Sequence, residues 1–407
     1  MSARTAPSPE PRPAPAASEA GLRVVGVMSG TSMDGADAVA VRLQREGAHL
    51  AWEVLARASL PYPDALRDRL HTAIRPGGGD VVALTRLHAE LGEHVAVLVA
   101  SMQDAAPRPA GEDEEPYDLV VMSGQTVYHI PRPDPERGWD APATLQLGEP
   151  SRVVERCGLP VVSDLRQADL AAGGQGAPMV PFGDLLLYGQ AGIARAVHNL
   201  GGISNLTWLP PDGDPDRVLA FDTGPANCLL DELAAAKAGL AYDEGGRLAS
   251  AGRVDDAVLE RLMAHPYLRL LPPKTTGREV FHLGELGATG LAALPTEDAL
   301  ATASEFTAAS VAEAYRAHVR PRGLDEVLLA GGGARNPDLV ARLRRHLRPL
   351  VATVDPFEAR GWDSRDREAL AFAVMGYEAW HGRVNTLPAA TGALHAVIGG
   401  RISLPPR

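Results

Sequence analysis

The 407-residue sequence contains only two cysteines, Cys157 and Cys228, and both lie in apolar surroundings. Two such thiols without a CxxC motif favour buried free cysteines in a reducing compartment over a disulfide or a metal site. No segment reaches the roughly 20 apolar residues that a membrane-spanning helix needs. The motifs HExxH and GxxxxGK[ST] are absent, and no GxGxxG follows an apolar run. The sequence therefore lacks the common signatures of zinc proteases, P-loop enzymes and dinucleotide-binding enzymes.

Positive charge is also scarce, since 39 Lys and Arg residues face 51 Asp and Glu residues and the net charge is −12. Nucleic acids and anionic membranes require a basic face, so we expect neither as a partner, and we expect a cytoplasmic protein. The length is sufficient for two domains. Residues 1–20 are rich in Pro, Ala and Ser and lack an apolar core, which predicts a disordered tail rather than a signal peptide.

Residues 24–41, VVGVMSGTSMDGADAVAV, predict a strand, a short polar loop and a second strand. The loop supplies the hydroxyl, glycine and carboxylate groups of Ser29, Gly30, Thr31, Ser32, Asp34, Gly35 and Asp37. Glycines let the backbone approach a ligand closely, and successive loop N–H groups can surround an anion. The two aspartates could face a metal ion or a reacting water. A plain hairpin turn explains this segment equally well. The other loops of the sequence must therefore decide whether it binds a phosphate.

Two further glycine-rich loops follow apolar runs. Asp222-Thr223-Gly224 lies between a strand at 219–221 and a helix at 228–238, so we expect N–H groups aimed at an anion and Asp222 facing a cation. Gly331-Gly332-Gly333 follows a strand at 327–329, and a purine could lie against a backbone without side chains. Another predicted hairpin, 197–208, turns at Gly201-Gly202.

Periodic apolar residues predict helices at 63–74, 81–102, 254–263, 297–319, 337–347 and 366–380. Short strands are expected at 117–122 and near 144–148. Asp169 precedes the glycine-rich run 173–176 and is a candidate general base. The alternative for Asp169 is a helix cap or an ion pair with Arg166. For the segment 272–282, a solvated surface loop is a commoner explanation than a loop that contacts a ligand.

A nucleotide site assembled from distant loops at 28–37, 222–227 and 331–336 is typical of the actin-like sugar-kinase architecture. In detail, the sequence resembles the anhydro-N-acetylmuramic acid kinase family. The matching segments are MSGTSMDGADAV at 28–39, GQT at 124–126, LRQADLAAGGQGAPMVP at 165–181, NLGGISNLT at 199–207, FDTGPANCLLD at 221–231, PPKTTGRE at 272–279, LLAGGGARNPDL at 328–339, REALAFAV at 367–374 and LPAATGA at 387–393.

The resemblance implies an α/β fold of two ribonuclease-H-like domains with a cleft between them. We expect domain I at 21–150 together with about 385–407, and domain II at 151–384. The family tends to form homodimers, but no stretch of this sequence identifies an interface.

The resemblance also implies site residues. The expected ATP-binding residues are Gly30, Thr31, Ser32, Met33, Asp34, Gly35, Ala36, Asp37, Gly201, Gly202, Asp222, Thr223, Gly224, Gly331, Gly332, Gly333 and Asn336. The expected sugar-binding residues are Ser29, Gln125, Thr126, Arg166, Gly174, Gln175 and Glu368. Asp34 and Asp222 are expected to hold Mg²⁺, directly or through water, and Asp169 is the expected catalytic base.

The activity that the resemblance implies is hydrolytic opening of 1,6-anhydro-N-acetylmuramic acid with phosphorylation of the freed O6 by ATP, a step of cell-wall recycling. Three alternatives stay open: a levoglucosan-type anhydro-sugar kinase, an ordinary sugar kinase in which Asp169 deprotonates a hydroxyl, and a non-catalytic actin-like nucleotide-binding module. The sequence departs from the family pattern at four positions. Ser123 and Asp184 stand where His is usual, His282 where Asn is common, and Arg367 where Lys is usual.

Overall fold

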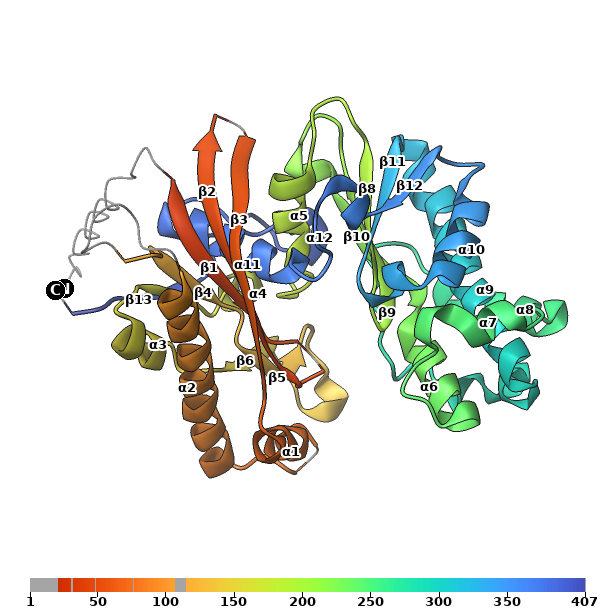
Figure 1. Ribbon diagram of the computed structural model, residues 1–407, viewed down its shortest axis with the longest axis horizontal. Coiled ribbons are helices and arrows are strands. Elements are labelled where there is room, and N and C mark those ends of the chain that lie inside the picture. The colour runs from red at the N-terminus through yellow and green to blue at the C-terminus, as the bar shows by residue number, and fades with distance from the viewer. Residues whose placement is uncertain (1–20, 31, 48, 76, 107–114, 407) are drawn as a thin grey trace, which may run out of the picture.

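The chain folds into two lobes, each built around a mixed sheet (Figure 1). The computed structural model describes residues 21–30, 32–47, 49–75, 77–106 and 115–406. The predicted tail at 1–20 and the side chain of Thr31 lie outside the described residues.

The first sheet starts with the predicted hairpin. Its strands are β1 (Leu22–Met28), β2 (Gly35–Glu46), β3 (His49–Pro61), β4 (Leu119–Met122), β7 (Val161–Ser163) and β13 (Arg401–Ser403). They lie in the order β13-β7-β4-β1-β2-β3. β1, β2 and β3 form an antiparallel meander, while β4 pairs parallel to β1 and β7 parallel to β4. Val24, Val25 and Val27 of β1 are buried, as expected for a central strand covered on both faces.

The second sheet repeats this arrangement. Its strands are β8 (Arg195–Leu200), β9 (Ile203–Leu209), β10 (Leu219–Pro225), β11 (Glu326–Ala330) and β12 (Thr353–Pro356), in the order β10-β9-β8-β11-β12. β8, β9 and β10 again form an antiparallel meander, and β11 and β12 again continue it in parallel. An antiparallel meander extended by parallel strands in both lobes confirms the predicted pair of ribonuclease-H-like domains. A separate ribbon of β5 (Gln125–Ile130) and β6 (Ala143–Leu147) extends the first lobe.

The helices cover the sheets. They are α1 (Asp64–Ala73), α2 (Val81–Ala105), α3 (Pro150–Cys157), α4 (Gln167–Ala171), α5 (Val180–Tyr188), α6 (Asn227–Ala238), α7 (Arg247–Ala251), α8 (Asp256–Met263), α9 (Thr296–Ala314), α10 (Pro337–Leu347), α11 (Arg367–Trp380) and α12 (Pro388–Thr391). The structure confirms every helix predicted above, and α9 continues as a π-turn at Tyr315–Val319. Within the described ranges, no helix is long and apolar enough to cross a membrane. Cys157 and Cys228 are free and buried, as predicted.

Helix α11 packs directly onto the first sheet, and glycines make that close approach possible. A Cβ at Gly26 of β1 would lie 2.2 Å from the carbonyl oxygen of Ala369, and a Cβ at Gly376 of α11 would lie 2.1 Å from a methyl group of Val121. Contacts this short exclude any larger side chain. The packing fixes the helix so that its first residues, Arg367 and Glu368, line the space between the lobes.

The predicted domain boundaries at 150 and 384 stay a prediction, but the strand pairing suggests a revision. β7 pairs with β4, and α11 packs against β1, so both segments accompany the first sheet. We propose that domain I contains residues up to the end of α5 at Tyr188 and the chain from α11 onward, and that domain II lies between them.

Candidate functional site

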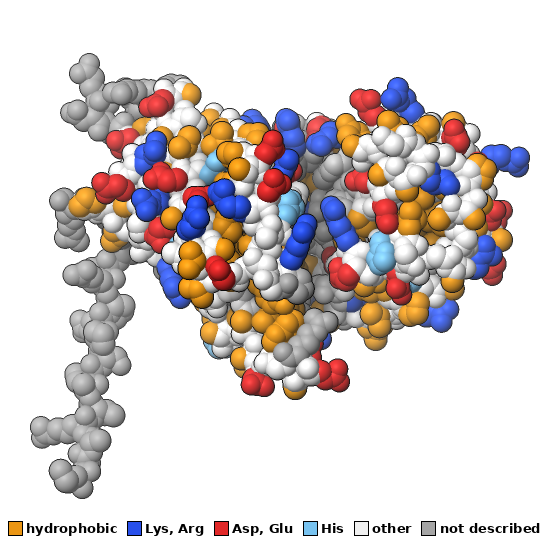
Figure 2. Space-filling view, turned by 90° about the horizontal axis from the view of Figure 1, so that it is seen from below, with side chains coloured by type: hydrophobic (Ala, Val, Ile, Leu, Met, Phe, Trp, Pro, Cys, Tyr) orange, Lys and Arg blue, Asp and Glu red, His pale blue; other side chains and the backbone are white. Residues whose placement is uncertain are grey.

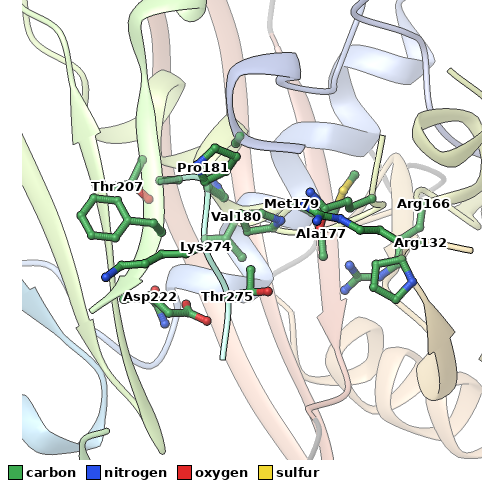
Figure 3. Close-up of a pocket in the computed structure, with 18 of the residues that line it drawn as sticks. Arg132, Arg166, Ala177, Met179, Val180, Pro181, Thr207, Asp222, Lys274 and Thr275 are labelled. Atoms are coloured by element: carbon green, nitrogen blue, oxygen red, sulfur yellow. The ribbon is translucent and has the colours of Figure 1, made fainter. Parts of the chain in front are cut away.

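A cavity of about 1030 Å³, called here the central cavity, lies between the two lobes. Figure 2 shows the molecule hollowed between its two halves, with Lys and Arg side chains on both sides of the hollow. In Figure 3, Arg132 and Arg166 lie at one end of the central cavity, and Asp222 and Lys274 lie at the other. Gln175 and Glu368 also line it, so four residues predicted to bind ligands meet here: Arg166, Gln175, Asp222 and Glu368.

A smaller cavity of about 240 Å³, called here the junction cavity, adjoins the central one. Its lining brings together the two ends of the first hairpin loop, Met28 and Asp37, with Gly201 of the second hairpin and Gly331 of the triple-glycine loop. Met28, Asn199, Arg367 and Glu368 line both the junction cavity and the central cavity. Segments of the first hairpin, the second hairpin and the triple-glycine loop therefore meet at the junction cavity, whereas the predicted Asp222 loop lines the central cavity instead.

A third cavity of about 540 Å³, called here the outer cavity, lies on the second lobe. Gly332 and Asn336 line it together with Asn227 of α6 and Tyr242. This is the place expected for the adenosine of a nucleotide whose phosphates reach the junction cavity. Asn336 also caps α10, because its side-chain oxygen accepts the N–H of Leu339 at 3.1 Å.

Hydrogen bonds from buried side chains hold the first hairpin loop. Ser123, which replaces the usual His, accepts the N–H of Ser29 through Oγ at 3.0 Å. Tyr62 donates to Ser29 Oγ at 3.1 Å and to Gln125 Oε1 at 3.3 Å, and Gln125 donates to the carbonyl of Gly30 at 2.9 Å. Ser29 and Gln125 thus brace the loop and line none of the three cavities. Their predicted sugar contacts stay a prediction.

The other described residues of the first hairpin have two kinds of position: Met33 and Asp34 contact the hairpin's own turn, and Asp37 faces the junction cavity. Met33 is buried with φ of 55°, so it anchors the turn through its side chain. Asp34 accepts from Ser32 Oγ at 2.7 Å and lines none of the three cavities. Asp37 accepts from Ser59 and faces the junction cavity. Among the described residues, no three His, Cys, Asp or Glu side chains gather as a metal site.

Asp169 lies on α4 and its carboxylate is completely buried. Oδ2 accepts the N–H of Gly176 at 2.8 Å, and Oδ1 accepts from Thr391 Oγ1 at 2.6 Å. A Cβ at Gly174 would lie 2.2 Å from Oδ2, so only glycine fits where the loop passes the carboxylate. Among the described residues, Asp169 and Arg166 form no ion pair, so the ion-pair alternative for Asp169 is excluded. Asp169 itself lines none of the three cavities, whereas Gln175, between Gly174 and Gly176 of the adjoining loop, lines the central cavity.

Arg166 is held beside this loop. Its Nη1 donates to the carbonyl of Gly176 at 2.6 Å, whereas its buried Nε has no partner among the described residues. Burial lowers the pKa of Arg166, against the opposing charges of Glu368 and Asp169. The predicted sugar residue Thr126 accepts from Gln146 at 3.2 Å and does not line the central cavity.

Asp222 is the carboxylate that the second lobe presents to the central cavity. Burial raises its pKa to about 6, although the N–H of Thr276, 2.8 Å from Oδ2, and the charge of Lys274 act in the opposite direction. Lys274 is buried, and its ammonium donates to the carbonyls of Tyr267 and Leu268. The segment 272–282 is therefore part of the site around Asp222, which the surface-loop explanation missed.

The residues on either side of Asp222, Phe221 and Thr223, are both buried. Thr223 is buried, and its hydroxyl contacts Ser204 Oγ at 2.7 Å. The backbone N–H groups of Ala226, Asn227 and Cys228 donate to the carbonyls of Gly201 and Gly202. The prediction that these N–H groups point at an anion is wrong, because the turn of the second hairpin caps the start of α6.

Two of the departures from the family pattern meet in space. Asp184 on α5 and Arg367 on α11 form a buried ion pair, with Nε of Arg367 2.8 Å from Oδ1 of Asp184. Burial alone would lower the pKa of Arg367, but the charge and hydrogen bonds of Asp184, together with the charge of Glu368, raise it overall. His282 lies in a turn, where Nδ1 accepts the N–H of Gly284.

Sequence reasoning missed several residues that line the cavities, namely Asn199, Asn205, Arg132 and Arg367. Asn199 and Asn205 lie inside the segment NLGGISNLT, so the matched motif already pointed to them. Arg132 lies in a Pro-rich stretch, and no local pattern marks it as a cavity residue.

Two lobes of repeated ribonuclease-H-like topology with a cavity between them are the architecture of actin-like ATPases and sugar kinases, and this chain is a member of that class. Within the class, it belongs to the anhydro-N-acetylmuramic acid kinase family, whose family model matches residues 22–405.

The curated relatives named anhydro-N-acetylmuramic acid kinase match almost the whole chain. One from Salinibacter ruber is 44% identical over 94% of this chain and 96% of that protein. Others from Streptomyces coelicolor and Bacillus anthracis are 42% and 37% identical, over 94% of this chain and 94% and 99% of those proteins. Among solved structures, a Streptomyces griseus ROK family glucokinase in complex with glucose and AMPPNP gives a TM-score of 0.36 at 13% identity, over 87% of this chain and 97% of that one. That likeness is too low to carry an argument.

Proposed function

We propose that this protein opens 1,6-anhydro-N-acetylmuramic acid with water and phosphorylates the freed O6 from ATP, giving N-acetylmuramic acid 6-phosphate for peptidoglycan recycling. The observation that carries the proposal is that Met28 and Asp37 of the first hairpin, Gly201 and Gly331 line a junction cavity beside the central cavity, which Asp222 lines. This arrangement suits a nucleotide that delivers its terminal phosphoryl group to a sugar oxygen. The match to the kinase family over nearly the whole chain supports the identity of the sugar.

In the proposed reaction, a water oxygen bonds to C1 of the sugar while the C1–O6 bond breaks. O6 then bonds to the γ-phosphorus as the bond to the ADP oxygen breaks, and Asp169 takes the proton from water. Coupling the two steps neutralises charge on O6 as it develops. The side chain of Asp169 accepts hydrogen bonds from Gly176 and Thr391, which hold the carboxylate in one orientation. Because Gly174 and Gly176 pass directly over this carboxylate, we propose that movement of the 173–176 loop lets the water reach it.

We further propose Mg²⁺ as the ion that accompanies ATP, with Asp222 as its protein ligand. Among the described residues, this carboxylate accepts one hydrogen bond, from the N–H of Thr276 to Oδ2, which leaves Oδ1 for a cation. Such an ion would screen the phosphate charges. Asp34, the other predicted ligand, lines none of the three cavities. We also propose that the protein forms a homodimer, as the family resemblance implies.

The pKa of Asp222 predicts how cation binding depends on pH. Because burial raises this pKa to about 6, the group is neutral below that value and cannot bind a cation well. We expect the affinity for Mn²⁺ to fall by about tenfold per pH unit below pH 6. It is measured by electron paramagnetic resonance without nucleotide, because phosphate groups also titrate near pH 6. Asp222→Asn should remove this dependence, whereas Asp34→Asn should retain it. Loss of the dependence in Asp34→Asn instead would assign the cation to the first hairpin.

The proposed activity is tested with one panel of sugars: anhydro-N-acetylmuramic acid, levoglucosan, N-acetylmuramic acid and N-acetylglucosamine. We expect ATP-dependent phosphorylation of the first, with ¹⁸O from labelled water found at C1 of the product. Turnover of levoglucosan alone would assign the protein to the related anhydro-sugar kinases. Turnover of only the non-anhydro sugars would make it an ordinary kinase, and ATP binding without any turnover would make it a nucleotide-binding module.

A further inference from the structure

The buried ion pair between Asp184 and Arg367 joins two residues that both depart from the family pattern. Nε of Arg367 donates to Oδ1 of Asp184 at 2.8 Å, and Nη2 donates to Oδ2 at 2.5 Å. Thr207, on β9 of the other sheet, donates to the same Oδ2 at 2.8 Å. The carboxylate therefore holds the guanidinium at two points, which fixes the plane of the group. Removing two charges from water is costly, so such a pair calls for a role beyond packing.

The position of Arg367 suggests that role. The residue lines both the central cavity and the junction cavity, together with Met28, Asn199 and Glu368. Its remaining nitrogen, Nη1, makes no hydrogen bond with any residue in the described ranges. Asp184, by contrast, is completely buried and lines neither cavity. Arg367 thus lines both cavities, has a fixed orientation and keeps one nitrogen that no described residue occupies.

We propose that Arg367 contacts the phosphoryl group during its transfer between the two cavities, and that Asp184 is a positioning residue that holds Arg367 for this contact. The inference rests on the proposed function, because it assumes that the junction cavity receives the phosphates. The family resemblance implies His and Lys at these two positions, and here Asp184 and Arg367 contact each other directly. An arginine can bind a carboxylate with one edge and an anion with its free nitrogen, whereas a lysine offers a single point charge.

This proposal predicts that Arg367 and Asp184 cannot be changed separately. In Arg367→Lys, the ammonium is drawn to the buried carboxylate of Asp184 and withdrawn from the cavity. We expect the affinity for ADP with aluminium fluoride, a mimic of the transferring phosphoryl group, to fall by about 100-fold. Affinity for ADP alone should stay unchanged, because the contact is to the transferred group only. Asp184→Asn should lower the aluminium fluoride affinity by about tenfold, since Arg367 is then less firmly oriented.

The double variant Asp184→His/Arg367→Lys restores the residues of the family pattern, and we expect it to recover most of the lost affinity. Arg57→Lys is the matched control. Arg57 makes a similar two-point contact with Asp366, one residue before Arg367, but lines neither the central nor the junction cavity. It should lower thermal stability slightly and leave both affinities unchanged. Melting temperatures of all variants report whether they fold.

Wild-type affinity for the aluminium fluoride complex in a folded Arg367→Lys protein would overturn the proposal. So would a double variant no better than Arg367→Lys, because the two positions would then act independently. These measurements use no sugar. A failure of the proposed function in the sugar panel would therefore be recognised separately from a failure at Arg367.

Discussion

Asp169→Asn is expected to abolish turnover of the anhydro-sugar while ATP binding stays nearly intact. The expected loss in kcat is about 10²–10⁴-fold, which is what a positioned general base contributes. The amide can keep the local structure, because its oxygen can accept the N–H of Gly176 and its NH₂ can donate to Thr391 Oγ1. What disappears is only the capacity to take a proton from water. Calorimetric titration with ADP and a single-turnover assay with the anhydro-sugar measure the two effects.

Asp164→Asn is the matched control for this variant. Asp164 lies five positions earlier in the same segment, pairs with Arg401 at 3.0 Å and lines none of the three cavities. Its replacement should leave kcat near the wild-type value. If Asp169→Asn keeps more than a few per cent of the wild-type activity, Asp169 is not the base.

The elements with a strong local pattern could be predicted from the sequence. The hairpin around residues 28–37 follows from two apolar runs joined by a Gly-Ser-Thr loop, and α2 follows from its apolar stripe. β3 was not among the predicted elements, although Trp52, Val54 and Ala56 alternate with more exposed residues in a strand-like period. The alternation is weakened by Leu55 and by the alanines, because apolar residues stand at outward-facing as well as inward-facing positions.

The partners within the site could not be predicted, because they depend on tertiary packing. Thr391 lies 222 positions from Asp169, and Arg367 lies 183 positions from Asp184. Each of these residues alone has an ordinary local explanation, such as a helix terminus or a loop. The wrong prediction for the start of α6 has the same origin. The sequence shows a helix with free N–H groups, but the turn at Gly201-Gly202 that occupies them belongs to another hairpin.

The triple-glycine loop has a backbone conformation and close neighbours that allow only glycine at position 331. Gly331 has φ of 83° and ψ of 176°, a conformation essentially restricted to glycine. A Cβ there would lie 2.5 Å from Oδ1 of Asn199 and 2.8 Å from the carbonyl oxygen of Leu200. Both residues lie at the end of β8, and Asn199 lines both the central and the junction cavity. The side chain of Asn199 can rotate away, but the backbone carbonyl of Leu200 can move only with the chain that leads into the turn at Gly201-Gly202.

Gly331→Ala should therefore damage nucleotide binding as well as stability. We expect a loss of about 1–3 kcal/mol in the free energy of unfolding from the backbone conformation, and a rise in the Kd for ADP of at least about tenfold, since a shift worth 1.4 kcal/mol at the site is enough for that. Gly361→Ala separates the two causes. Gly361 has a similar φ of 75°, no atom within 4 Å of its Cβ position, and no place in the three cavities. Its replacement should lower the denaturation midpoint and leave the Kd unchanged, so an equal Kd in both variants would mean that the loop at Gly331 does not hold the nucleotide.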